Sequence, residues 1–96
     1  MRRGRGAALS FLIMELSVDR DSGEPAYLQL AAQIRAAIVS GELAGRVPSA
    51  RSVSEESGTG MLTARRALRV LAEEGYVKVT NGLGTFTRPR GDWPGG

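Results

Sequence analysis

Three glycines, Gly58, Gly60 and Gly75, divide the middle of this 96-residue chain and restrict what it can fold into. Between the last two, apolar residues recur at positions i, i+3, i+4 and i+7, the spacing of a helix with one buried face (Ala64, Ala67, Leu68 and Leu71). Before Gly58, the pair Pro48-Ser49 opens a shorter helix, which Ser49 can cap by accepting a hydrogen bond from the first free N–H groups. The pattern predicts two short helices joined by a tight turn, the second over about 62–74.

A longer helix is predicted upstream of this pair. Pro25 fits the first turn of a helix, because its missing N–H costs nothing there. Apolar residues then recur with a helical period as far as Ile38, and Gly41 is a natural stop. We therefore expect a helix over 26–40, a connecting loop over 42–47, and a short β-strand that runs through Val18 before this helix.

Residues 76–87 have the pattern of a β-hairpin. β-Branched and aromatic residues stand on both sides of Asn81-Gly82, a pair that favours positive φ in a tight turn. The expected fold is therefore α+β: a winged helix-turn-helix of three helices followed by a hairpin wing, with a short N-terminal strand. The expected divisions are an extension over 1–24, the domain over 25–87, and a flexible tail over 88–96, which shows no periodicity. Docking of Trp93 on the domain is an alternative that the sequence leaves open.

Composition argues against an enzyme. The chain has neither cysteine nor histidine, so a disulfide framework, a thiolate metal site and the commonest general base are all ruled out. Its carboxylates occur as solvated pairs in polar helical stretches. The one apolar run, Ala7 to Met14, is far too short to span a bilayer. We expect a cytoplasmic protein that is not an enzyme, with no catalytic residues, no bound metal or cofactor and no membrane association.

The basic residues are unevenly placed. Arg2, Arg3 and Arg5 account for the whole formal charge of +3, so the rest of the chain is balanced. Within this balanced part, three arginines gather on the polar face of the predicted helix 62–74 (Arg65, Arg66 and Arg69). An α-helix fits the major groove of DNA, where its N-terminal residues meet base edges. Arginines on its outer face would neutralise phosphates or bind guanine, and a following hairpin would touch the adjacent backbone or the minor groove.

Five segments make a resemblance to a known family specific. In order, they are YLQLAAQIRAAIVSGEL, PSARSVSE, TARRAL, LAEEGYV and NGLGTF, and they all lie between Pro25 and Phe86. In sequence and spacing the chain resembles the winged-helix DNA-binding domain of the GntR family of bacterial transcriptional regulators. The segment LSVD before the first long helix is similar to the compact YtrA-like branch. The resemblance implies double-stranded DNA as the partner.

The resemblance assigns residues one by one. The family's DNA-contacting arginine in the second helix corresponds to Arg51. In the recognition helix Thr63 and Arg65 match, whereas Met61 stands where the family has a leading arginine. The glycine-rich wing tip corresponds to Asn81, Gly82 and Gly84. With the helix N-terminus and the basic face added, the candidate DNA-binding residues are Ser49, Arg51, Met61, Leu62, Thr63, Arg65, Arg66, Arg69, Asn81, Gly82 and Gly84.

Met61 and Leu62 leave three interpretations open. They pack inward as core, they face DNA and touch thymine methyl groups, or they face a protein partner. Arg46 and Lys78, by contrast, are expected to be solvated.

The preferred functional hypothesis is a GntR-type repressor that lacks an effector domain. It would bind an inverted repeat as a homodimer held together by the apolar strand from Phe11 to Val18. The alternative is a winged-helix module that binds a protein partner, such as an anti-repressor, with weak or no DNA binding.

Overall fold

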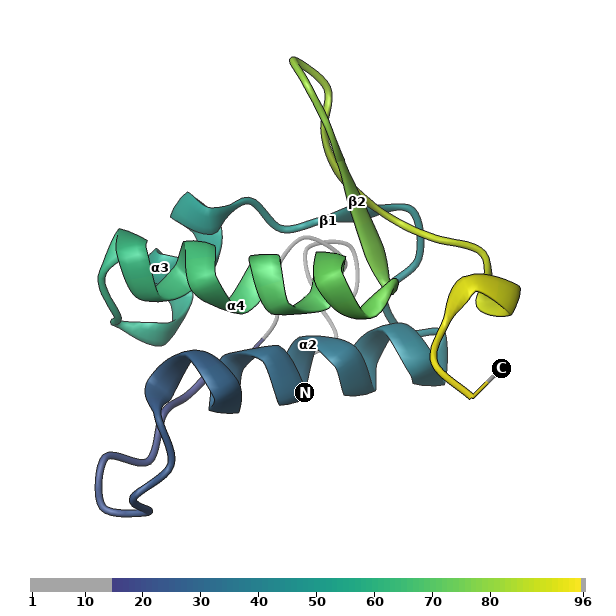
Figure 1. The fold of residues 1–96 in the computed structure, drawn as a ribbon. Coiled ribbons are helices and arrows are strands. Elements are labelled where there is room, and N and C mark those ends of the chain that lie inside the picture. The colour runs from purple at the N-terminus through teal and green to yellow at the C-terminus, as the bar shows by residue number, and fades with distance from the viewer. Residues whose placement is uncertain (1–14, 96) are drawn as a thin grey trace, which may run out of the picture.

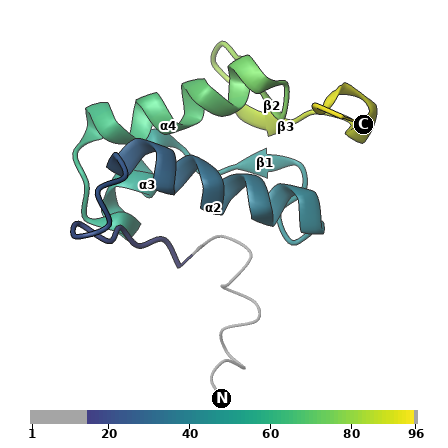
Figure 2. The same ribbon diagram turned by 60° about the horizontal axis from the view of Figure 1, so that its bottom comes forward.

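The computed structural model describes residues 15–95, and Figure 1 shows how their elements are arranged. The elements in chain order are α2 (Ala26–Ser40), β1 (Arg46–Val47), α3 (Ala50–Ser57), α4 (Met61–Glu74), β2 (Val77–Thr80), β3 (Gly84–Thr87) and a 3-10 helix, η1 (Arg90–Asp92). Helices α2 and α4 lie side by side in both views (Figures 1 and 2). The β2–β3 hairpin projects on the side of α4 away from α2 (Figure 1), so the predicted winged helix-turn-helix is confirmed.

The three predicted helices form close to their expected limits. Helix α2 has the predicted bounds, and Gly41 ends it with a left-handed φ of 87°. Ser49 caps α3, since its hydroxyl accepts a hydrogen bond from the Ser52 N–H at 3.1 Å. Helix α4 begins at Met61, one residue earlier than expected, because Gly60 takes the extended conformation of a cap residue. Capping and glycine stops therefore fix the helix ends, as the sequence indicated.

Side-chain hydroxyls hold the turn between α3 and α4. The Ser54 hydroxyl donates to the Thr59 carbonyl oxygen at 2.6 Å, and the hydroxyls of Ser57 and Thr59 lie 2.8 Å apart. Gly58 provides the left-handed conformation at the end of α3, with φ 75°. These bonds supply partners for the polar groups of the turn. Val53 is the buried residue of α3, the helix that precedes the turn.

One apolar core joins the helices to the sheet. Its largest fully buried side chains come from α2, α3, α4 and β2 (Leu30, Ile34, Val53, Leu71 and Val77). The predicted inward face of α4 is confirmed, because Ala64, Ala67, Leu68 and Leu71 are all buried. Since α2 and α3 both pack against it, α4 is held by its inner face while its outer face stays in solvent.

The predicted loop over 42–47 is wrong at its end. Arg46 and Val47 form β1, which pairs antiparallel with β3 so that Arg46 lies opposite Phe86 and Val47 opposite Thr85. The sheet therefore has three strands in the order β1-β3-β2. A two-residue strand shows no alternation of its own, and its partner strand lies about 40 residues further along the chain.

The predicted hairpin is confirmed, but its turn differs from a two-residue connection. The Leu83 N–H donates to the Thr80 carbonyl oxygen at 3.0 Å, which closes a turn over 80–83. Gly82 has φ 79°, whereas φ of Asn81 is negative. Positive φ at the third residue alone is the signature of a type II turn, so the glycine is the residue that this turn requires.

The expected strand before α2 is not found in its described part, 15–18. Gln33 binds the backbone of this segment instead, because its amide accepts from the Ser17 N–H at 3.1 Å and donates to the Ser17 carbonyl at 2.6 Å. Leu16 is buried in the core and anchors the segment. The side-chain amide of Gln33 thus makes the backbone hydrogen bonds that a partner strand would make. Residues 1–14, which contain half of the proposed dimer strand (11–18), lie outside the described residues.

Residues 88–95, for which the sequence predicted a flexible tail, pack against the domain. The Trp93 ring lies 5.7 Å from the Tyr76 ring, and its Nε1 donates to the Arg88 carbonyl at 2.9 Å. An ion pair between Arg88 and Asp92 closes η1 at 2.9 Å. Gly75 permits the approach, since a Cβ there would lie 2.8 Å from the Asp92 carbonyl oxygen. One aromatic anchor orders the tail, and a lone aromatic gives no periodic signal.

Candidate nucleic-acid interface

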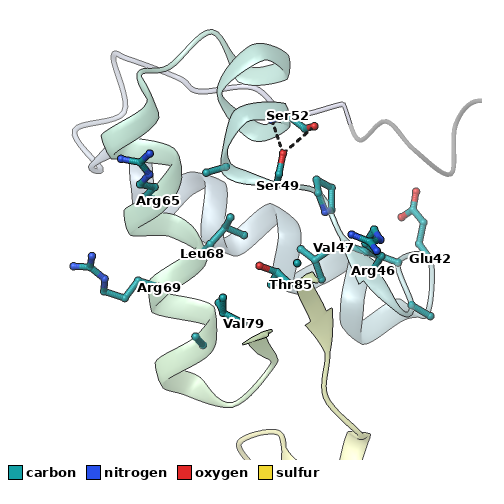
Figure 3. Close-up of a pocket in the computed structure, with 16 residues that line it drawn as sticks. Glu42, Arg46, Val47, Ser49, Ser52, Arg65, Leu68, Arg69, Val79 and Thr85 are labelled. Atoms are coloured by element: carbon teal, nitrogen blue, oxygen red, sulfur yellow. Dashed lines mark hydrogen bonds between the residues drawn. The ribbon is translucent and has the colours of Figure 1, made fainter. Parts of the chain in front are cut away.

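An open groove of about 1040 Å³ runs between α4, the start of α3 and the sheet (Figure 3). Arg65 and Arg69 line one side of it from α4, and Ser49 and Ser52 line the end formed by α3. The other side comes from the sheet, through residues such as Val79 and Thr85. The groove therefore brings the basic helix, the wing and the start of α3 to one surface.

Arg65 and Arg69 are the cations that this surface leaves available. Both side chains are exposed and project from α4 one turn apart (Figure 3). Neither forms an ion pair with an acidic side chain within residues 15–95, whereas Arg35 pairs with Glu74 and Arg88 with Asp92. Two unpaired guanidinium groups on an exposed helix face are suited to bind an anion such as a phosphate, or the acceptor atoms of guanine.

Arg66, which the sequence grouped with these two arginines, points elsewhere. Its guanidinium lies over the Tyr27 ring of α2, 4.0 Å from the ring centroid. Successive residues of a helix are about 100° apart, so Arg66 is turned from the groove toward α2. Its stacking on an aromatic ring contributes to the packing of α4 on α2. The structure thus separates Arg66 from the pair formed by Arg65 and Arg69.

Arg51 and Ser49 lie at the start of α3. Arg51 is exposed and forms an ion pair of 3.2 Å with Glu55, one turn further along. Exposed pairs of this kind contribute little, about 0–1 kcal/mol, so a phosphate can compete for the guanidinium. The Ser49 hydroxyl is occupied by the helix cap, and it borders the groove.

The first turn of α4 settles one of the questions that the sequence left open. Leu62 is 72% exposed and Met61 is 38% exposed, so neither is part of the core. Thr63 is half-buried. The inward positions belong to Ala64 and Ala67, whose short side chains let α4 approach its neighbours closely. The interpretations that remain for Met61 and Leu62 are contact with DNA and contact with a protein.

The wing places its polar tip in solvent. Asn81 and Gly82 are exposed at the turn, and Gly84 is half-buried with φ 119°. This conformation favours glycine, and a Cβ at Gly84 would also lie 2.7 Å from Nη1 of Arg46, so the guanidinium would have to move.

Arg46 is a residue of this surface whose role was missed in the sequence. Arg46 and Lys78 are both exposed, as expected. Arg46 in addition donates from Nη1 to the Leu83 carbonyl at 2.8 Å and lies over the Phe86 ring at 5.1 Å. It therefore braces the wing from β1. The sequence analysis did not predict strand β1. Without the pairing of β1 with β3, nothing in the sequence places Arg46 opposite Phe86.

No helix within residues 15–95 is long and apolar enough to cross a membrane.

The comparison with known proteins agrees with this geometry. An HTH-type transcriptional regulator from Rhizobium meliloti is 40% identical over 71 residues, which are 72% of this chain and 29% of the relative. The HTH-type transcriptional repressor NagR of Bacillus subtilis is 34% identical over 73 residues, 74% of this chain and 30% of NagR. The chain thus spans less than a third of the length of these curated relatives.

A solved structure extends the similarity to the fold. YtrA from Sulfolobus acidocaldarius, a GntR-family transcription factor, superimposes with a TM-score of 0.72 at 31% identity, over 79% of this chain and 82% of that one. Residues 26–87 match the family described as bacterial regulatory proteins, gntR family, which covers α2, the helix-turn-helix and the wing. Because this match takes in more than half of the chain, the protein belongs to the gntR family of bacterial regulatory proteins.

Proposed function

We propose that this protein is a sequence-specific DNA-binding transcriptional regulator that acts as a repressor in the bacterial cytoplasm. The observation that carries the proposal is the pair Arg65 and Arg69, exposed and without an acidic partner in residues 15–95, beside the wing of a gntR-family domain. In this arrangement α4 enters the major groove and the wing lies along the adjacent backbone or minor groove. The similarity to NagR, a repressor by name, supports repression.

The proposed contacts fall into two groups. Arg65 and Arg69 reach base edges or phosphates from the outer face of α4, with Thr63 and the first turn of the helix nearest the bases. Ser49, Arg51 and the wing tip (Asn81, Gly82 and Gly84) meet the backbone on either side. Phosphate contacts position a protein on the duplex, and base contacts give it specificity. Arg66 is left out of the first group, because it is stacked on Tyr27.

Selection of bound duplexes from random double-stranded DNA, at two salt concentrations, tests this function. The proposal predicts enrichment of a defined half-site, with weaker binding at the higher salt, since bound arginines release counterions from the phosphates. The alternative, a winged helix that binds a protein partner, is favoured by the exposed side chain of Leu62. That alternative predicts neither enrichment nor salt-dependent binding.

We also propose that the protein binds DNA as a homodimer on an inverted repeat. One small domain makes few phosphate contacts, so a single copy should bind weakly at physiological salt. Sedimentation of the full chain and of a version beginning at Ser17 should show a dimer for the first and a monomer for the second. A shortened chain that remains as dimeric as the full one would contradict an interface in the segment 11–18.

A further inference from the structure

Among residues 15–95 the large exposed apolar side chains are Val39, Met61, Leu62, Val79 and Leu83. Met61 and Leu62 are adjacent in the first turn of α4, and Val79 and Leu83 lie on the wing. Both α4 and the wing border the groove.

Leu62 is the most exposed of them, at 72%. It precedes Arg65 by three residues and Arg69 by seven, so the helical period places all three on the outer face of α4. It also lies in the first turn, and the N-terminal residues of a recognition helix are those that contact base edges. Because the inner face of α4 packs against α2 and α3, Leu62 lies on the outer face. It is nearer the N-terminus of the helix than Arg65 and Arg69.

The chemistry of the major groove then restricts what Leu62 can recognise. A leucine side chain neither donates nor accepts a hydrogen bond, so it cannot read the polar atoms of a base edge. Thymine is the one base of unmodified DNA that offers an apolar group there, its C5-methyl. We propose that Leu62 reads a thymine methyl group in each half-site; this inference rests on the proposed function.

Charge favours duplex DNA over a protein as the occupant of this surface. Leu62 shares the exposed face with Arg65 and Arg69, neither of which has an acidic partner among the described residues. A polyanion satisfies both guanidinium groups while the leucine approaches the bases.

Replacing single thymines by deoxyuridine in a selected duplex tests the inference, because the exchange removes only the methyl group. We expect at least one position in each half-site at which the exchange weakens binding about fourfold, the value for burying one such group. The loss should be much smaller in Leu62→Ala, because alanine lacks the Cγ and Cδ atoms with which leucine would contact the methyl. Val39→Ala, a truncation of an exposed apolar residue on α2, should keep the loss and serves as the matched control.

The outcomes separate this inference from the function on which it rests. Selected duplexes in which every thymine tolerates deoxyuridine would overturn the role of Leu62 and leave sequence-specific binding intact. If the deoxyuridine exchange still weakens binding fourfold in Leu62→Ala, the role of Leu62 would likewise be overturned. No enriched duplex would overturn both proposals, and binding of a protein through Leu62 would then be the remaining explanation of its exposure.

Discussion

Replacing Arg65 and Arg69 by alanine is expected to weaken binding to the selected duplex by about 1–3 kcal/mol for each side chain that reads a base. A side chain that meets a phosphate should instead lower the salt dependence, by about 0.9 in the logarithmic slope for each phosphate that is no longer neutralised. Fluorescence anisotropy titrations at several salt concentrations measure both quantities. Since the two residues are exposed, the melting temperature should stay nearly unchanged.

Arg20→Ala is the matched control for this prediction. It removes the same charge from an exposed position in the loop before α2. Binding should therefore change much less than in Arg65→Ala or Arg69→Ala. Equal losses in all three variants would show that net charge alone drives binding, and they would contradict a specific role for the outer face of α4.

Leu71→Ala should destabilise the domain by about 2–5 kcal/mol, because it opens a cavity under α4. Leu71 is fully buried and belongs to the core that joins α4 to α2 and the sheet. Urea unfolding followed by circular dichroism measures the free energy of unfolding. For a domain of this size each kcal/mol of destabilisation lowers the melting temperature by about 4–8 °C, so the variant should melt well below the parent.

Leu62→Ala makes the same chemical change on the same helix and is the control for Leu71→Ala. Because Leu62 is largely exposed, its truncation should alter the free energy of unfolding by no more than about 0.5 kcal/mol. The two variants together test the rotation of α4 about its axis. Similar losses for both leucines would mean that Leu62 is not on the solvent side.

The helices were predictable because local signals specify them. The apolar period of α4, the glycine stops at Gly58 and Gly75, and the Ser49 cap each act within a few residues. The strand β1 was not predictable, since it has two residues and exists only through pairing with β3. The sequence left the docking of Trp93 open for a similar reason, because this docking depends on contact with Tyr76.

In the candidate site too, local features were predictable and features that depend on tertiary contacts were not. The sequence identified the basic helix and the wing, because charge, periodicity and turn residues mark them. It did not separate Arg66 from Arg65 and Arg69, since the direction of Arg66 is set by the Tyr27 ring on another helix. Nor did it find the role of Arg46, whose bond to the Leu83 carbonyl depends on the sheet. Side-chain direction thus required the tertiary packing.

Duplex DNA is proposed to bind to the face formed by α4 and the wing. Chemical-shift mapping of the ¹⁵N-labelled protein, as the selected duplex is added, locates the bound face residue by residue. We expect the largest changes over 61–69 and 81–85, with smaller ones at the start of α3. Changes confined to 26–40 and 88–95, or no change at all, would contradict it.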